Sequence, residues 1–151
     1  MNVTFRLAQR NDVPTIVQML AEDELGAERE RFETPLSRVY YEAFEAIAND
    51  ANHELLVAEM DGDVIGSLHL MFLPSISYQG GTRAQVESVR VIQRLRGQGI
   101  GAKMMKWAIE RARQRGCRLM QLTSHQSRTD AHHFYEKLGF VKSHIGMKIN
   151  L

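Results

Sequence analysis

Three glycines spaced by single residues, Gly97, Gly99 and Gly101, follow two arginines, Arg94 and Arg96. Glycines leave backbone N–H groups bare, and a helix that begins in such a loop adds its positive end, so an anion can bind there. An arginine guanidinium binds phosphate in a bidentate way. This segment therefore predicts a site for a phosphate or pyrophosphate; a glycine-rich loop with two solvated arginines is the plainer alternative.

Two common phosphate-binding loops do not fit. A P-loop requires a Lys followed by Ser or Thr, whereas Lys103 is followed by Met104. A dinucleotide-binding turn leaves its strand almost at once, and the next strand ends in an acidic residue. Here five residues separate Val91 from Gly97, and no acidic residue stands at 121–125. Both loops are excluded.

The elements that must position this loop follow from hydrophobic periodicity. Asp61-Gly62 between two apolar runs predicts a type I′ hairpin, and the acid-rich stretch 22–33 predicts a loop. Strands are expected near 3–7, 54–60, 64–72, 84–92, 119–123 and 140–149, and helices near 12–24, 35–49, 100–116 and 129–138. The order β-α-α-β-β-β-α-β-α-β indicates one mixed α/β domain over residues 1–151.

The spacing of Arg94, Gly97 and Gly99 resembles the Arg/Gln-x-x-Gly-x-Gly/Ala signature of the GNAT family of N-acetyltransferases. The preceding residues 86–91 are similar to that family's fourth strand. About thirty residues on, the segment 134–140 looks like its other hallmark, a Phe-Tyr pair followed by Leu-Gly-Phe. The resemblance implies a single-domain GNAT-like fold, a mixed, mostly antiparallel central sheet flanked by helices, with acetyl-CoA as co-substrate.

The same resemblance implies how acetyl-CoA is held. Backbone groups of Val89 and Val91 would pair with the pantetheine arm, and the Val89 N–H, or a neighbour at a local bulge, would polarise the thioester carbonyl. The family often has an Asn that contacts the pantetheine arm. Arg128 stands at that position in this sequence, and we assign the contact to the neighbouring Ser127. The pyrophosphate would be bound by the loop residues Arg94, Arg96, Gly97, Gln98, Gly99, Ile100 and Gly101.

By the same resemblance, Tyr135 matches the tyrosine that protonates the departing CoA thiolate. A phenol with a pKa near ~10 suits that role, and packing beside Phe134 is the alternative. No metal is predicted, because the histidines His125, His132 and His133 lack a carboxylate–histidine ligand set at recognisable spacing.

Glu87 stands where several relatives place a general base. Strand alternation predicts that it shares a face with Val89 and Val91. Pairing with Arg83 or Arg90 is the structural alternative for this carboxylate. Glu22, Asp23 and Glu28 are the other candidates for the base.

The charge is distributed unevenly. Residues 1–63 carry 14 acidic and 5 basic side chains, a net of −9, and residues 64–151 carry 4 acidic and 14 basic, a net of +10. The basic half contains the proposed CoA loop, and the acid-rich stretch 22–33 favours a cationic amine. However, residues 128–144 also look like the aminoalkylphosphonate acetyltransferases, whose anionic amine would need a basic pocket such as Arg83 or Arg90. The sequence therefore leaves both a cationic and an anionic acceptor amine as alternatives.

Composition and length narrow the class further. The 151 residues include a single cysteine, Cys117, which favours a reducing compartment, and we expect a cytoplasmic protein. No apolar run reaches membrane-spanning length, the N-terminus does not resemble a signal peptide, and a net charge of +1 does not favour nucleic acid.

We therefore expect an acyltransferase that acetylates a primary amine, most simply a small molecule, by direct attack in a ternary complex. Acetylation of a protein N-terminus or lysine is the first alternative. A non-catalytic acyl-CoA-binding regulatory module is the second. The apolar tail 145–149 suits a homodimer contact without requiring one.

Overall fold

Five strands form one sheet in a computed structural model that describes residues 2–151. Their spatial order is β1-β2-β3-β4-β5. Neighbouring strands are antiparallel except β4 and β5, which are parallel. This confirms the predicted mixed, mostly antiparallel sheet. The strands are β1 Thr4–Leu7, β2 His53–Met60, β3 Asp63–Leu73, β4 Arg83–Val91 and β5 Leu119–Gln121.

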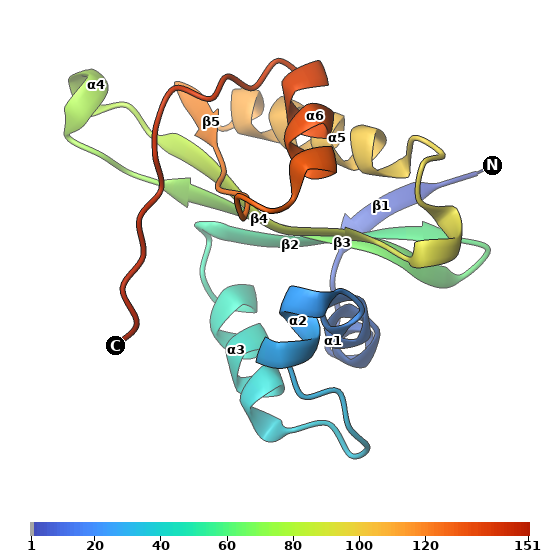
Figure 1. The fold of residues 1–151 in the computed structure, drawn as a ribbon. Coiled ribbons are helices and arrows are strands. Elements are labelled where there is room, and N and C mark those ends of the chain that lie inside the picture. The colour runs from blue at the N-terminus through green and yellow to red at the C-terminus, as the bar shows by residue number, and fades with distance from the viewer. Residues whose placement is uncertain (1) are drawn as a thin grey trace. The chain divides into compact units, whose positions relative to one another are not determined.

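The chain packs as two units, one ending at Gln121 and the other covering Leu122–Leu151. The first unit holds the sheet and five helices: α1 Val13–Ala21, α2 Glu24–Arg29, α3 Arg38–Ala48, the four-residue α4 Ser77–Gly80 and α5 Ile100–Gln114. Within this unit, α1, α2 and α3 cover one face of the sheet and α5 covers the other (Figure 1). The second unit contains α6, Thr129–Lys137.

Strand alternation divides the core of the first unit between these two faces. Leu68, Leu70 and Phe72 of β3 are fully buried, as are Met104 and Ala108 of α5. On the other face Val57 packs with Ile16 and Met19 of α1. Because the sheet is covered on both sides, β2 and β3 are nearly continuous apolar runs rather than strictly alternating ones.

The hairpin predicted at Asp61-Gly62 is confirmed. Asp61 has φ 54° and Gly62 has φ 84°, as a type I′ turn between antiparallel strands requires. Met60 pairs with Asp63 across it.

Two boundaries on the helical side differ from the prediction. The stretch expected to be a loop contains α2, because the Asp23 carboxylate caps it by accepting the Gly26 N–H at 2.6 Å. The helix expected from Pro35 begins at Arg38 instead, with Ser37 at its N-cap position.

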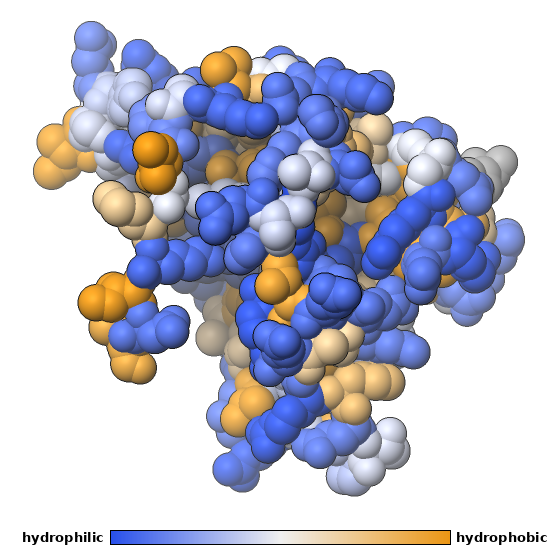
Figure 2. Space-filling model, viewed as in Figure 1, coloured by the Kyte–Doolittle hydropathy of each residue, from blue (hydrophilic) through white to orange (hydrophobic). Residues whose placement is uncertain are grey.

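The strand predicted over 140–149 is wrong. Residues 140–151 form no strand, and Val141, Ile145, Met147, Ile149 and Leu151 are each at least 80% exposed. Figure 2 shows orange, apolar side chains along the segment that ends at the C-terminus in Figure 1. The alternation is real, but a strand needs a neighbour for its backbone groups, and among residues 122–151 there is no other strand.

Candidate acyl-transfer site

A β-bulge interrupts β4 at the centre of the sheet. His69 lies opposite Glu87, and Ser67 lies opposite Arg90. Two steps along β3 therefore match three along β4, which gives β4 one extra residue. The bulge is at Ser88, which has φ 56°. This left-handed conformation is unusual for a residue with a side chain.

The bulge shifts the alternation of every residue that follows it. Arg90, opposite Ser67, takes the face that Glu87 occupies before the bulge, while Val91, opposite Gly66, points to the α5 face. The prediction that Glu87 shares a face with Val89 and Val91 is therefore wrong. It assumed an uninterrupted strand.

Beyond the bulge, the backbone of β4 is open on the side away from β3. The Ile92 N–H donates to Ile65 O of β3 at 2.9 Å, so by alternation the backbone groups of Val91 and Val89 point the other way. β5 pairs with β4 only at Arg83, Ala84 and Gln85. In the part of the chain that the structure describes, no strand therefore pairs with residues 86–91 on this side.

Two arginine side chains reach the exposed carbonyls of this strand edge. The Arg96 Nε donates to Val91 O at 3.0 Å, and an Arg90 Nη donates to Val89 O at 3.0 Å. Each guanidinium also meets a carboxylate from the segment after α1, Arg96 with Glu22 and Arg90 with Asp23, both at 3.6 Å. A pair of ion pairs thus ties the acid-rich segment to the strand edge.

The glycine loop leads from this edge into α5. Gly97 has φ 77° and Gly99 φ 84°, which residues with side chains rarely adopt. Within the described chain, no hydrogen bond occupies the amides of 97–102, because the first turn of a helix leaves its N–H groups without intrahelical partners. Ile100 is buried in the core, so it offers an anion only its amide.

Glu87 lies in a polar row on the α1 face of the sheet. Gln85 Nε2 donates to Glu87 Oε1 at 2.9 Å, and Gln121 Nε2 donates to Gln85 Oε1 at 2.9 Å. Across β3, His69 lies opposite Glu87 and is hydrogen-bonded to His53, with 2.8 Å between His69 Nε2 and His53 Nδ1. Burial lowers the pKa of His69, the charge on His53 acts in the same direction, and the Glu87 carboxylate opposes both.

Arg83 begins the same row and closes the preceding loop. One of its Nη atoms donates to Ser77 Oγ at 2.5 Å and to Ser75 Oγ at 3.4 Å. Its guanidinium lies 5.4 Å from the centre of the Tyr78 ring. Its Nε is buried without a hydrogen-bond partner. A cationic group beside two hydroxyls is suited to an anion.

In the second unit, the C-terminal end of α6 fixes Tyr135. The Phe140 N–H donates to Tyr135 O at 3.1 Å, and the Gly139 N–H donates to Glu136 O at 3.0 Å, with Gly139 at φ 103°. These two bonds form a Schellman motif, in which a hydrophobic contact joins the first and last residues. Here that contact is between the rings of Tyr135 and Phe140, 5.9 Å apart. The Tyr-x-x-Leu-Gly-Phe pattern is thus a helix cap that orients the Tyr135 ring.

The remaining predicted contact, Ser127, lies in the turn before α6. Its Oγ is 2.7 Å from His125 Nδ1, and the His132 Nε2 is 2.9 Å from His125 O. These histidines therefore serve the turn that precedes α6. Among residues 2–151, no three His, Cys, Asp or Glu side chains gather into a metal site. None of the helices in this part of the chain combines the length and the apolar character that a membrane span requires.

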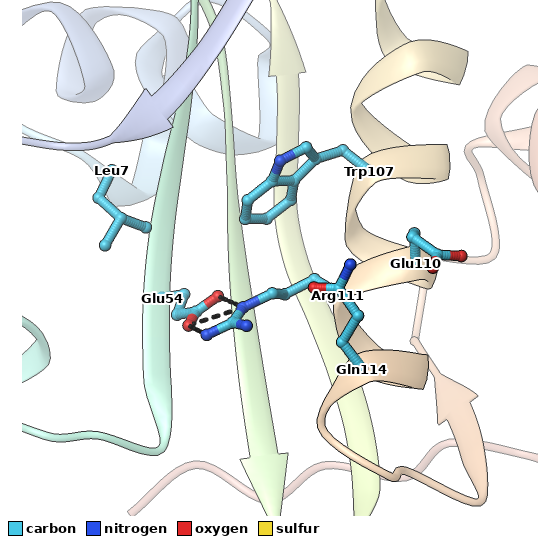
Figure 3. Close-up of a pocket in the computed structure, with 6 residues that line it drawn as sticks. All are labelled: Leu7, Glu54, Trp107, Glu110, Arg111 and Gln114. Carbon is cyan, nitrogen blue, oxygen red and sulfur yellow. Dashed lines mark hydrogen bonds and ion pairs between the residues drawn. The ribbon is translucent and has the colours of Figure 1, made fainter.

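A separate cavity of about 380 Å³ lies between the β1–β2 edge and α5. Figure 3 shows Glu54 and Arg111 facing each other in it. Arg111 donates to the Glu54 carboxylate through Nε at 2.8 Å and Nη2 at 2.7 Å. The charges of this pair neutralise each other, and none of the predicted site residues lines the cavity.

Sequence reasoning missed the histidine pair, the glutamine row and the two serines beside Arg83. His69 and Glu87 sit in strands that were recognised, so the pairing register between those strands was the missing information. Ser75 and Ser77 lie in a loop whose conformation no periodicity encodes.

Comparisons with known proteins agree with this architecture. The model of the acetyltransferase (GNAT) family matches residues 17–140. An aminoalkylphosphonate N-acetyltransferase of Salmonella typhimurium (strain LT2) is 34% identical over 110 residues, covering 71% of this chain and 69% of that protein. A glucosamine 6-phosphate N-acetyltransferase of Trypanosoma brucei brucei is 32% identical over 90 residues, covering 60% and 59%.

Among solved structures, a chain described as a transcriptional regulator from Bacillus halodurans C-125 superimposes with a TM-score of 0.97 and 48% identity, covering 99% of this chain and 100% of that one. The family match spans the strand edge, the glycine loop and the Tyr135 helix together. The chain belongs to the GNAT family of N-acetyltransferases and is an acyltransferase.

Proposed function

We propose that this chain, acting as one domain over residues 1–151, transfers the acetyl group of acetyl-CoA to a primary amine of a small molecule by direct attack in a ternary complex. The observation that carries the proposal is the open edge of β4 beyond Ser88. It presents the backbone of Val89 and Val91 beside a glycine loop whose amides are unoccupied.

The pantetheine arm, in this proposal, pairs with β4 as an added strand. Its amides take over the Val91 and Val89 carbonyls from the two arginines. Arg96, released from Val91 O, then turns to the pyrophosphate together with Arg94 and the amides of the glycine loop. The loop's empty space around Gly97 and Gly99 admits a close approach of phosphate oxygens.

Glu87 accepts a proton from the ammonium, directly or through a water, and the free amine attacks the thioester carbonyl. The Val89 N–H stabilises the oxyanion. The tetrahedral intermediate collapses as Tyr135 donates its phenolic proton to the departing thiolate, with Ser127 contacting the pantetheine arm. The roles of Glu87, Val89 and Tyr135 follow the family resemblance, whereas Ser127 is only the neighbour of the position where the family often has an Asn. The Schellman motif supports a fixed orientation of the Tyr135 ring.

For the acceptor, we propose an amine that also carries a phosphonate or phosphate group. Both curated relatives are described as acting on such amines. In this chain Arg83, with Ser75 and Ser77, is suited to the anionic group. The Cα atoms of Arg83 and Glu87 lie four residues, or about 13 Å, apart along β4, so both side chains and an intervening water must span this separation for one small acceptor to reach both. The cationic-acceptor alternative loses support, because Glu22 and Asp23 already meet Arg96 and Arg90.

An acceptor screen that follows CoA release tests this. Glucosamine 6-phosphate and glucosamine form a matched pair that differs in the phosphate alone, and an aminoalkylphosphonate and a polyamine complete the set. We expect kcat/KM at least tenfold higher for the phosphorylated or phosphonylated amines, and Arg83→Met should remove most of that preference. Equal rates for all four amines would refute the anionic-acceptor proposal, and a faster polyamine would restore the cationic one.

A regulatory role is the second candidate. The description of the Bacillus halodurans chain as a transcriptional regulator favours it. A protein that binds acetyl-CoA tightly but releases no CoA with any amine, peptide N-terminus or lysine would support regulation over acetylation.

The exposed tail supports a further proposal, a homodimer in which residues 145–149 pair with the same residues of a second copy. The single cysteine, Cys117, supports a separate proposal, that the protein is cytoplasmic and keeps this thiol reduced. Light scattering should report a dimer for the full chain and a monomer for the double variant Ile145→Lys, Met147→Lys. A wild-type monomer would refute the homodimer.

A further inference from the structure

Arg96 links the open edge of β4 to the acid-rich segment that follows α1. Its Nε donates to Val91 O at 3.0 Å, and its Nη2 lies 3.6 Å from Glu22 Oε2. The Arg96 side chain is 47% exposed and the Glu22 side chain is 29% exposed, so both groups reach solvent. One guanidinium, directly before the glycine loop, is therefore held by a backbone carbonyl and by a carboxylate at the same time.

Arg90 repeats this arrangement in a more buried place. Its Nη1 donates to Val89 O at 3.0 Å, and its Nη2 lies 3.6 Å from Asp23 Oδ2. Only 13% of the Arg90 side chain is exposed. Each of the two arginines thus joins one carbonyl of the strand edge to one of two neighbouring carboxylates.

The corner between α1 and α2 fixes these two carboxylates independently of the arginines. Glu22 is the C-cap residue of α1. Asp23 caps α2 through Oδ1, which accepts the Gly26 N–H at 2.6 Å, so Oδ2 is the oxygen that faces Arg90. Gly26 is buried, and a Cβ built there would lie 1.7 Å from Leu20 O, so the two helices meet without room for a side chain. The fold therefore holds the carboxylates where the arginines meet them.

We propose that Glu22 competes with the pyrophosphate of acetyl-CoA for Arg96, and so lowers the affinity of the empty site for the acyl donor. This inference rests on the proposed function, in which the pantetheine arm takes Val91 O and Arg96 turns to the pyrophosphate. When Arg96 Nε leaves Val91 O, the guanidinium leaves the position in which Nη2 faces Glu22. The carboxylate and the pyrophosphate repel each other, so one anion replaces the other on the guanidinium, and the displaced carboxylate is solvated.

The exposure of the Glu22–Arg96 pair sets the size of the effect. The state that binds acetyl-CoA is the one in which Arg96 has left Glu22, and an apparent Kd rises as that state becomes a smaller fraction of the unliganded protein. A partly exposed ion pair changes an equilibrium constant by at most about fivefold. The pair should therefore weaken acetyl-CoA binding about two- to fivefold, which is measurable and does not prevent binding.

A double-mutant cycle on acetyl-CoA affinity, measured by calorimetric titration, tests this competition. Glu22→Gln keeps the size of the side chain and removes its charge, so acetyl-CoA should bind about two- to fivefold more tightly than to wild type. Arg96→Met removes the contested cation, and adding Glu22→Gln to it should change the affinity by less than about 1.5-fold. Glu24→Gln removes the same charge from an exposed side chain at the start of α2. This matched control should also change the affinity by less than about 1.5-fold.

Two results would overturn the inference while leaving the proposed function intact. One is an affinity of Glu22→Gln that equals or falls below the wild-type value, because the ion pair would then persist in the complex. The other is a gain of the same size in the Arg96→Met background or in Glu24→Gln, because the loss of any negative charge would then explain it. A wild type that binds no acetyl-CoA would instead refute the proposed function, and the competition with it.

Discussion

Gly99 and Gly62 offer a matched pair of substitutions. Both have φ 84°, and a Cβ built on either meets nothing within 4 Å. The left-handed conformation costs an L-residue roughly 1–2 kcal/mol, so Gly99→Ala and Gly62→Ala should each destabilise the fold by about that much. Since ~1 kcal/mol corresponds to roughly 2–4 °C in a chain of this size, each Tm should fall by about 2–8 °C.

The two variants should nevertheless differ in cofactor binding. Gly62 lies in the β2–β3 hairpin, whereas Gly99 lies in the loop before α5. A methyl group at Gly99 enters the space that the proposed pyrophosphate would occupy. We expect Gly99→Ala to weaken acetyl-CoA binding at least tenfold, which is about 1.4 kcal/mol, and Gly62→Ala to change it less than twofold.

Thermal unfolding followed by calorimetric titration with acetyl-CoA separates the two effects. Equal losses of affinity in the two variants would show that backbone strain, not proximity to the cofactor, governs binding. Undiminished affinity in Gly99→Ala would refute the assignment of the pyrophosphate to this loop.

Three further predictions concern the acid, the N-terminal strand and pH. Tyr135→Phe keeps the ring contact with Phe140 but removes the phenolic proton, so kcat should fall at least tenfold with little change in KM; a full rate in a chemistry-limited assay would refute the acid role. Arg6→Met removes hydrogen bonds to Asp12 at 2.7 and 3.0 Å and to Glu59 at 2.8 Å. Because the Arg6 side chain is a third exposed, we discount the loss of unfolding free energy to about 1–2 kcal/mol. The Tm should therefore fall by about 2–8 °C, and an unchanged Tm would contradict this prediction. The hydrogen bond from Arg6 lowers the pKa of Asp12 in the folded state. The stability that the ionised Asp12 contributes is therefore complete above the ordinary carboxyl pKa near ~4 and disappears as pH falls through the lower pKa of the folded state. Urea midpoints between about pH 5 and 2.5 should fall more steeply in wild type than in Arg6→Met, and parallel curves would refute this linkage.

Local signals predicted those parts of the fold that local geometry controls. Asp61-Gly62 specified its hairpin because only a few residue types tolerate positive φ at both positions. The glycines before α5 and the Leu-Gly-Phe cap after Tyr135 were recognisable for the same reason. These features place the glycine loop and Tyr135 on the correct elements without any knowledge of tertiary structure.

Register and pairing were beyond the reach of the sequence. Serine is not a residue type that favours a left-handed conformation, so the residue types did not predict the reversal of faces after Glu87. A local bulge was expected only as something that the family resemblance implies. His53 and His69 are 16 positions apart and meet only through the β2–β3 register. The alternating tail 140–149 resembled a strand, yet pairing depends on a partner that periodicity does not supply.

Calorimetric titration of the wild-type chain and of Gly99→Glu with acetyl-CoA tests the proposed cofactor site most directly. We predict saturable binding of one acetyl-CoA per chain in wild type and loss of binding in Gly99→Glu, whose carboxylate would face the pyrophosphate. Absence of binding in wild type, or equal affinity in both proteins, would contradict the proposal that the open β4 edge and its glycine loop hold the acyl donor.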